Sequence, residues 1–293
     1  MFGLLNLDKP AGLTSRDVVN RVQRLVRPHK VGHAGTLDPL ATGVLVVAIG
    51  TATRLIEYVQ RMEKRYRGTF LLGRTSDTED VAGLVVELAG ASVPTEEQIR
   101  ETLPQFIGTI EQRPPAFSAL KVAGQRAYDL ARRGDAVELA PRPVEIYAIE
   151  VLRYDDPELE LRIRCGSGTY IRSLGRDLAQ ALGTDAIMSA LRREAIGPFQ
   201  ANEALSVDRL DAETIRQRLQ SAALALGEMP RIVVNEDEMA HLARGQAIRN
   251  RFGVNAHEVA ALDSADNLAA ILVPATAELL RPTKCFVATQ ASG

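Results

Sequence analysis

Residues 32–45 read GHAGTLDPLATGVL and combine three glycines, one carboxylate and the start of an apolar run. The run continues to Ile49 and is rich in β-branched residues, which predicts a buried strand over residues 44–49. Pro39 disfavours helical backbone at Asp38, and the glycines permit a tight turn before the strand. The pattern therefore predicts a carboxylate presented on a constrained loop at the edge of a sheet, a usual place for catalytic side chains.

Strand patterns and helix patterns follow one another irregularly along the chain. Strands are expected at residues 3–8, 44–49, 64–73, 144–153 and 159–165, with shorter ones at 231–234, 259–262 and 269–273. Helices are expected after caps at Thr14 or Ser15 and at Thr95, and over residues 55–59, 125–133, 174–182, 187–193 and 206–226. This irregular mixture predicts an α+β fold.

The length and composition indicate a globular protein with a large core. The chain has 293 residues, of which 46% are hydrophobic. Pro230 and the short β-like runs after it predict a boundary, with one domain over residues 1–228 and a small β-rich domain over residues 229–293. No run of about 18 apolar residues is present, so no membrane span is expected. The first ten residues, MFGLLNLDKP, are charged too early for a secretory leader, and none is expected.

Cysteine and histidine usage excludes two classes of site. Cys165 and Cys285 are the two cysteines and lie far apart, which predicts reduced thiols and a cytoplasmic protein. The four histidines lack zinc-ligand spacing, so no metal site is expected. The sequence also contains no phosphate loop and no dinucleotide-binding glycine pattern.

The charge distribution favours an anionic partner more than the net charge of −2 does. Residues 1–67 carry 11 Lys and Arg against 5 Asp and Glu, whereas residues 202–279 carry 7 against 12. Basic residues of the chain form three clusters, which are Arg16, Arg21, Arg24, Arg27 and Lys30, then Arg61, Lys64, Arg65 and Arg67, then Arg126, Arg132 and Arg133. Phosphate binding depends on the local field, so these clusters are candidates for nucleic-acid contacts or, individually, solvated helix faces.

Asp38 and Arg172 are the first candidates for chemistry. A carboxylate on a constrained loop acts as a nucleophile or base, or it simply forms a turn before proline. Arg172 follows a glycine turn at residues 166–168 and needs an acidic partner if it is buried. Asp38 and Asp177 both qualify as that partner from the spacing alone.

Tyr66 lies in the segment KRYRG, between Lys64, Arg65 and Arg67. A ring among cations is typical of a platform for a nucleobase, and it is equally typical of a half-buried strand tyrosine. The same two interpretations apply to Tyr170.

Weaker candidates complete the set. Lys9, beside Pro10, is a phosphate ligand or a support for the Tyr66 strand. Lys121 is an RNA contact or, more commonly, a surface lysine. His33 binds a base or satisfies a loop carbonyl.

Several ordered segments resemble the bacterial TruB family of tRNA pseudouridine synthases, which modify uridine 55 in the T loop. They are GLLNLDKPAGLTS (3–15), GHAGTLDPLATGVL (32–45), KRYRG (64–68), RPPAFSALKVAGQRAYDLARRG (113–134), GTYIRSL (168–174) and LRR (191–193). The resemblance spans about residues 3–200. It implies a catalytic domain with a central mixed or antiparallel sheet, an RNA-binding insertion at about residues 74–134, and a PUA-like RNA-binding domain in the tail.

The resemblance also implies roles for individual residues. Asp38 matches the catalytic aspartate, Arg172 the arginine paired with it, and Tyr66 the tyrosine that stacks on the target uracil. Tyr170 and Leu191 match residues that line the base pocket, although Leu191 alone would be assigned to the core. His33 matches a histidine that holds the T loop open, and Lys9 matches a motif that supports the tyrosine strand. Lys64, Arg65 and Lys121 are expected to contact RNA.

The implied activity is isomerisation of uridine 55 to pseudouridine in a base that has been flipped out of the T loop. This reaction imports no group, so no cofactor is expected, and the expected partner is the tRNA T stem-loop bound by a monomer. A tRNA folding chaperone that does not need catalysis is a second possibility. A guide-RNA-dependent subunit of the archaeal and eukaryotic branch is the alternative; the segment at residues 113–134 favours a stand-alone enzyme over it.

Overall fold

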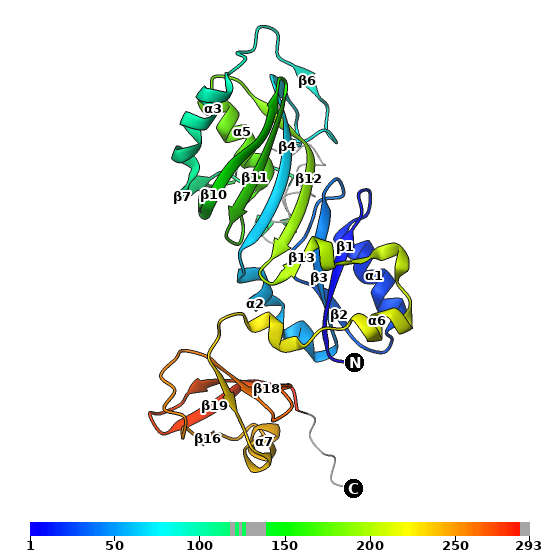
Figure 1. Cartoon of the computed structure of the whole chain (residues 1–293), viewed down its shortest axis with the longest axis vertical. Coiled ribbons are helices and arrows are strands. Elements are labelled where there is room, and N and C mark those ends of the chain that lie inside the picture. Colours follow the sequence, from blue (N-terminus) through cyan, green and yellow to red (C-terminus); the bar gives the residue numbers. More distant parts are fainter. Residues whose placement is uncertain (118–120, 123–124, 127–138, 288–293) are drawn as a thin grey trace.

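The computed structural model describes residues 1–117, 121–122, 125–126 and 139–287. These residues form a large mixed sheet with helices on its faces and a separate β-rich part near the C-terminus, which lie at different heights along the longest axis (Figure 1). The predicted α+β fold is confirmed.

The large sheet contains ten strands in the described part of the chain. They are β1 (Gly3–Lys9), β2 (Val31–His33), β3 (Thr42–Ile49), β4 (Lys64–Leu72), β7 (Gly108–Gln112), β10 (Arg142–Asp155), β11 (Glu158–Cys165), β12 (Ala186–Ile196), β13 (Phe199–Gln200) and β14 (Leu205–Ser206). The strand order is β14-β1-β3-β12-β4-β11-β10-β7, with β2 paired to β3 and β13 to β12. β1 with β14 and β3 with β12 are parallel pairs, and the other pairs are antiparallel.

Helices α1 and α5 cover much of one face of this sheet. Helix α1 (Ser15–Leu25) packs Val18 and Val22 onto the β1–β3 half, and helix α5 (Ile171–Ala181) packs its apolar side onto the β4–β11 half. Residues that pair directly across strands point to the same face, and Gly43 in β3, Arg193 in β12 and Tyr66 in β4 form such a row. Leu45, two residues after Gly43, belongs to the apolar cluster of α1, and Tyr66 belongs to that of α5. Both helices therefore lie on the same face. The middle of the sheet, formed by β3, β12 and β4, therefore lies beneath the space between the N-terminal ends of α1 and α5.

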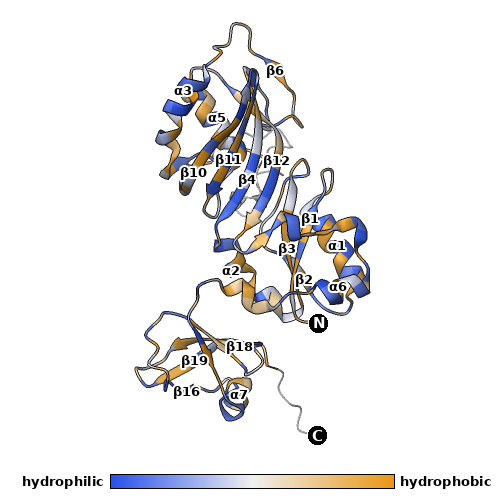
Figure 2. Cartoon of the chain, in the orientation of Figure 1, coloured by the Kyte–Doolittle hydropathy of each residue, from blue (hydrophilic) through white to orange (hydrophobic). Residues whose placement is uncertain are grey.

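The opposite face of the sheet has an apolar half and a charged half. Over β1 and β3 it is covered by the turn η1 (Gly50–Leu55), helix α2 (Ile56–Arg61) and the turn η5 (Ala222–Leu226). Over β4, β11 and β12 it carries arginines and glutamates, and Figure 2 shows hydrophilic residues along β4 and β12. Strand alternation therefore sends every second residue of β4 away from the α5 face.

The C-terminal part forms a five-stranded sheet within the described residues, in the order β15-β17-β18-β19-β16. Its elements are β15 (Arg231–Val233), α7 (Glu236–Ala243), β16 (Ile248–Arg249), β17 (Val259–Leu262), β18 (Leu268–Pro274) and β19 (Leu279–Cys285). Lys284 pairs with Glu57 of α2 at 2.5 Å, and Tyr58 donates to Glu258 at 2.9 Å. The predicted β-rich C-terminal domain is confirmed, and these contacts fix it to α2.

The segment between β4 and β10 contributes to the main core. Its described elements are β5 (Arg74–Thr75), β6 (Val86–Glu87), α3 (Glu96–Thr102), η2 (Leu103–Phe106), β7, β8 (Lys121–Val122) and β9 (Gln125–Arg126). Thr95 caps α3 in a capping box with Gln98, as the sequence predicts. Ile99 and Leu103 belong to the same apolar cluster as Leu174. The expected insertion is thus anchored in the domain core through α3 and β7.

Three predicted helices are wrong in part or in whole. Residues 187–193 belong to strand β12, because pairing with β4 on one side and β3 on the other outweighs the helix-forming residues. Residues 206–226 are broken into η4 (Val207–Arg209), α6 (Ala212–Arg218) and η5, because side chains of Ser206, Asp211 and Ser221 each cap a new element. Gln125 and Arg126 pair with β8 as a strand, and the rest of the expected helix at 125–133 lies outside the described residues.

Candidate active site

The loop that carries Asp38 lies between β2 and β3 and is fixed by the start of α1. Ser15 Oγ accepts a hydrogen bond from Leu37 N at 2.8 Å and donates to Leu37 O at 3.2 Å. Gly12 N donates to Pro39 O at 2.8 Å, and Ala41 N donates to Asp38 O at 3.0 Å. The backbone on both sides of the carboxylate is therefore held, and Asp38 keeps a defined direction.

Arg193 of β12 holds the other end of this loop. Its guanidinium donates to Val44 O at 2.7 Å, to Gly35 O at 3.1 Å and to Thr36 O at 3.4 Å. The backbone of β12 also passes so close to Gly43, at φ +99°, that a Cβ there would lie 2.2 Å from Arg193 O. Only glycine fits at that crossing.

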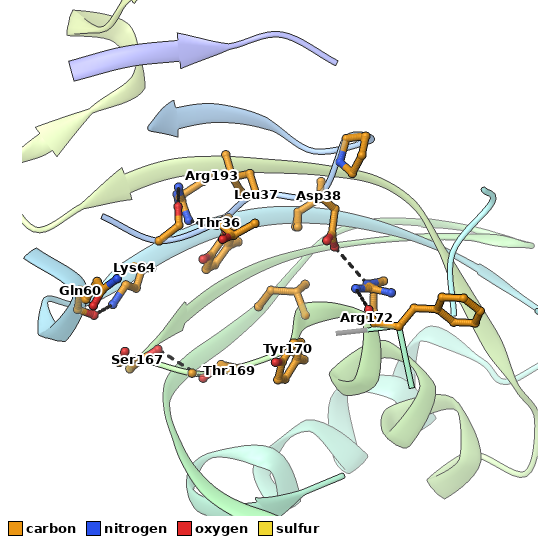
Figure 3. A pocket seen from close by; sticks show the side chains of 18 of the residues that line it. Thr36, Leu37, Asp38, Gln60, Lys64, Ser167, Thr169, Tyr170, Arg172 and Arg193 are labelled. Carbon is orange, nitrogen blue, oxygen red and sulfur yellow. Dashed lines mark hydrogen bonds and ion pairs between the residues drawn. The ribbon is translucent and has the colours of Figure 1, made fainter. Parts of the chain in front are cut away.

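Arg172 of α5 meets Asp38 across the pocket. Its Nε lies 3.1 Å from Asp38 Oδ2, and Figure 3 shows the two side chains approaching from opposite walls. Asp80 Oδ2 lies 3.8 Å from the same guanidinium, which also donates to Thr78 O at 2.8 Å and to Phe117 O at 3.1 Å. The guanidinium is buried, so these acceptors replace the water that it loses.

The structure resolves the choice of partner for Arg172. Asp177 pairs instead with Arg176, at 2.7 Å. Arg172 therefore connects the Asp38 loop to the segment that carries Thr78 and Asp80. The Asp38 side chain is 37% exposed beside this buried cation and lines the pocket, so its carboxylate is accessible to a bound ligand.

A pocket of about 570 Å³ opens over this ion pair. Asp38, Tyr66, Tyr170, Arg172, Leu191 and Lys64 are among the residues that line it. Tyr66 is buried in β4, and burial raises the pKa of its phenol, so the ring is neutral at physiological pH. Two aromatic rings and a leucine beside a charged pair suit a flat, polar-edged ligand of the size of a nucleobase.

Tyr170 is positioned by its backbone. Gln112 of β7 accepts from Tyr170 N at 2.8 Å and donates to Tyr170 O at 3.0 Å. The Arg142 guanidinium lies 5.1 Å from the centre of the ring, close enough for a cation–π contact. The ring at the start of α5 is thus held between the edge strand of the sheet and a cation.

Comparison with known proteins identifies the family. The family model described as TruB family pseudouridylate synthase (N terminal domain) matches residues 23–171, and that of the tRNA pseudouridylate synthase B C-terminal domain matches residues 172–229. A Dehalococcoides mccartyi protein named tRNA pseudouridine synthase B is 40% identical over 98% of this chain and 97% of its own length. The chain belongs to the TruB family of pseudouridylate synthases. The resemblance seen in the sequence is confirmed.

Further TruB-family relatives and solved structures agree. A tRNA pseudouridine synthase B from Acaryochloris marina is 46% identical over 77% of each chain. A structure of an H/ACA RNP bound to a substrate RNA containing 2'-deoxyuridine aligns with a TM-score of 0.74 and 26% identity, over 99% of this chain and 86% of the other. A Cbf5-Nop10-Gar1 complex aligns with the same TM-score and 28% identity, over 98% and 86%.

Within this TruB-family fold, Lys9 is a buried residue with three acceptors. Its ammonium donates to Leu13 O at 2.7 Å, to Pro10 O at 2.8 Å and to Pro39 O at 3.3 Å. Burial lowers the pKa of Lys9 to about 8, although the Asp38 carboxylate opposes the shift. The side chain is enclosed, so it supports the Asp38 loop instead of reaching an RNA phosphate or the Tyr66 strand.

We expect Lys9 to make the folding stability rise with pH above about 8. Between pH 8 and 10.5 the folded protein has released this proton and the unfolded chain still holds it, so raising the pH favours folding. From about pH 7.5 to about pH 9.5 the wild type should gain about 1–2 kcal/mol in unfolding free energy relative to Lys9→Met. Urea denaturation of both proteins at the two pH values measures the difference. Parallel profiles would contradict the assignment.

The other expected RNA contacts lie in different places. Lys64 lies on the pocket side of β4, and burial lowers its pKa to about 8, whereas Arg65 lies on the opposite face and pairs with Glu194 at 3.4 Å. His33 ends β2 and is half-buried; burial, together with the nearby charge of Arg16, lowers its pKa. Lys121 lies in β8, and its side chain is outside the described residues.

Arg193, Asp80 and Gln112 are site residues that sequence reasoning missed. Arg193 ends the LRR segment, which the sequence predicts to be helical. As a strand, the segment alternates, so that Leu191 and Arg193 line the pocket and Arg192 points away from it. Asp80 lies in a polar loop and carries no local signal. Among the described residues no cluster of three His, Cys, Asp or Glu side chains could hold a metal, and no helix could span a membrane.

Proposed function

We propose that the chain isomerises uridine 55 in the T loop of tRNA to pseudouridine, with Asp38 as the catalytic carboxylate. The observation that carries the proposal is the Asp38–Arg172 pair at the base of a pocket lined by Tyr66, Tyr170 and Leu191. The relatives named tRNA pseudouridine synthase B support tRNA as the substrate class.

The reaction conserves every atom of the nucleoside. The bond between N1 of uracil and C1′ of the ribose breaks, the ring turns, and C5 bonds to C1′; the proton that C5 loses is matched by one gained at N1. Asp38 acts at the sugar as a nucleophile or takes a proton as a base. Arg172 pairs with the carboxylate at 3.1 Å and keeps it oriented toward the bound base.

The pocket requires that the target base leave its stack. A base that is stacked inside a folded loop cannot reach a carboxylate within the pocket, so it must first be extruded. Extrusion costs a few kcal/mol of lost stacking. Stacking on the Tyr66 ring would recover about 1–3 kcal/mol of this. Leu191 and Tyr170 supply the remaining apolar wall.

Replacement of Tyr66 by Ala is expected to slow the catalytic step about 5- to 100-fold and to weaken tRNA binding less, because one stacking contact is lost at the extruded base and the backbone contacts remain. Single-turnover rates and filter-binding affinities measure the two effects separately. Tyr154→Ala is the matched control, since Tyr154 donates to Pro94 O outside the pocket. A larger loss in affinity than in rate would contradict the stacking role.

Two other functions compete with this proposal. A tRNA folding chaperone would not require Asp38, and the two activities are compatible in one protein. A guide-RNA-dependent subunit receives support from the likeness to the Cbf5 complex, but that likeness is at 28% identity, whereas the relatives named tRNA pseudouridine synthase B reach 40–46%.

The proposal is tested by mapping pseudouridine in unmodified tRNA incubated with this chain alone. Pseudouridine at position 55, without guide RNA or partner protein, is the expected result. Pseudouridine at another position would overturn the site specificity, and activity only with a guide RNA would favour the alternative branch.

A further inference from the structure

Helix α1 carries positive charge that the fold does not neutralise. Arg16 and Arg24 lie on its exposed side, and Arg27 follows its last turn, also exposed. Among the described residues, no acidic side chain forms an ion pair with any of these three arginines, and no hydrogen bond engages their guanidinium groups. Three exposed guanidinium groups on one short segment are therefore available to an external anion.

The second basic cluster of the sequence is different. Arg61 pairs with Glu57 at 3.2 Å, Arg67 with Glu160 at 2.5 Å and Arg65 with Glu194 at 3.4 Å. Lys64 is buried. The structure thus separates two clusters that look alike in the sequence: of these two, within the described residues, the one on and just after α1 is the cluster with unpaired arginines. The third cluster falls in the segment around residues 123–138, most of which is outside the described residues.

The three arginines form one strip. At 100° per residue, Arg16 and Arg24 lie about 80° apart around α1, on the side opposite the buried Val18 and Val22, and Arg27 follows the C-cap Val26. A surface depression lined by Asn20, Arg24 and Arg27, among others, runs along the same side. Arg24 therefore connects the other two members of the strip, because it shares a side of α1 with Arg16 and this depression with Arg27.

This strip begins at the active-site pocket. Thr14, the N-cap of α1, lines the pocket, and Ser15 is bonded to Leu37 in the Asp38 loop. At 1.5 Å per residue, Arg24 lies about 15 Å along the helix axis from Thr14. An RNA whose target base enters the pocket would have its neighbouring backbone within reach of the strip.

We propose that the exposed side of α1 is a second RNA-binding surface, which holds backbone phosphates of the substrate outside the loop that enters the pocket. The inference rests on the proposed function. Guanidinium groups bind phosphate oxygens in a bidentate way and independently of sequence. Two acids lie near the strip: Asp17, which accepts hydrogen bonds from Thr14 in the capping box, and Asp208, 3.7 Å from Arg21. The four arginines of this segment (Arg16, Arg21, Arg24 and Arg27) outnumber these two carboxylates, so a positive excess remains.

The test is tRNA binding as a function of salt for the triple variant Arg16→Ala, Arg24→Ala, Arg27→Ala. With three phosphate contacts removed, the slope of log affinity against log salt should fall by roughly 2–3, and affinity at about 0.1 M salt by about 10- to 100-fold. The single-turnover rate at saturating protein should stay near that of the wild type, because the pocket is unchanged.

The matched control is Arg67→Ala, Arg162→Ala, Arg164→Ala. It removes the same charge from the opposite face, where the three arginines pair with Glu160, Glu150 and Glu63, respectively. An equal loss of affinity in the control would show a general charge effect and overturn the proposal, as would an unchanged salt slope in the α1 variant. Wild type that binds tRNA but forms no pseudouridine would instead refute the proposed function and leave the α1 result interpretable.

Discussion

Replacement of Asp38 by Asn is expected to lower the rate of pseudouridine formation by roughly 10⁴-fold or more. Asparagine has nearly the same shape, so it can stay on the loop held by Ser15 and Arg193, but its amide is neither a base nor a nucleophile at neutral pH. Affinity for tRNA should be nearly unchanged, because a carboxylate offers no attraction to phosphate. Release of tritium from tRNA labelled at C5 of uridine measures the rate, and filter binding measures the affinity.

Asp80→Asn is the control for this result. Asp80 approaches the same Arg172 guanidinium as Asp38, at 3.8 Å, but it is buried and accepts from Thr78 and Ala82 instead of lining the pocket. If Asp38 acts chemically, the Asp80 variant retains most of its activity in the folded fraction. Equal losses in the two variants would mean that both carboxylates only position Arg172, which would contradict the catalytic role of Asp38.

The parts of the site that sequence predicted are those with a local signal. Asp38 is marked by proline, glycines and a following strand, all within a few residues, and the strand that carries Tyr66 is marked by alternation. Helix α1 is marked by its cap at Thr14. In each case the backbone conformation is determined by residues that are close in sequence, through turns, caps or strand alternation.

The parts that sequence missed depend on contacts between distant segments. Arg193 reaches loop carbonyls about 150 residues away, and Asp80 meets Arg172 from a polar loop 92 positions earlier. Residues 187–193 looked helical because their side chains favour helix, and only pairing with two neighbouring strands makes them a strand. The alternation around Tyr66 also explains why the second basic cluster is not a free basic surface. Arg65 and Arg67 point to the face opposite Tyr66, where they pair with Glu194 and Glu160.

Arg172→Met is expected to lower the unfolding free energy by about 3–5 kcal/mol and to abolish activity. The substitution leaves the buried Asp80 without its cation and removes the hydrogen bonds that Arg172 donates to Thr78 O and Phe117 O. Urea denaturation measures the loss. Arg164→Met is the comparison, because its pair with Glu63 is exposed to solvent and should contribute less than about 1 kcal/mol. Similar losses in the two variants would contradict a buried role for Arg172.

A double variant separates the two roles of Arg172. Adding Asp80→Asn to Arg172→Met removes the uncompensated buried charge, so stability should recover by at least about 1 kcal/mol relative to Arg172→Met alone. Activity should not recover, because Asp38 still lacks the cation that holds it oriented. Recovery of both would show that Arg172 serves folding only. Recovery of stability without activity would assign Arg172 to the Asp38 carboxylate as a positioning residue.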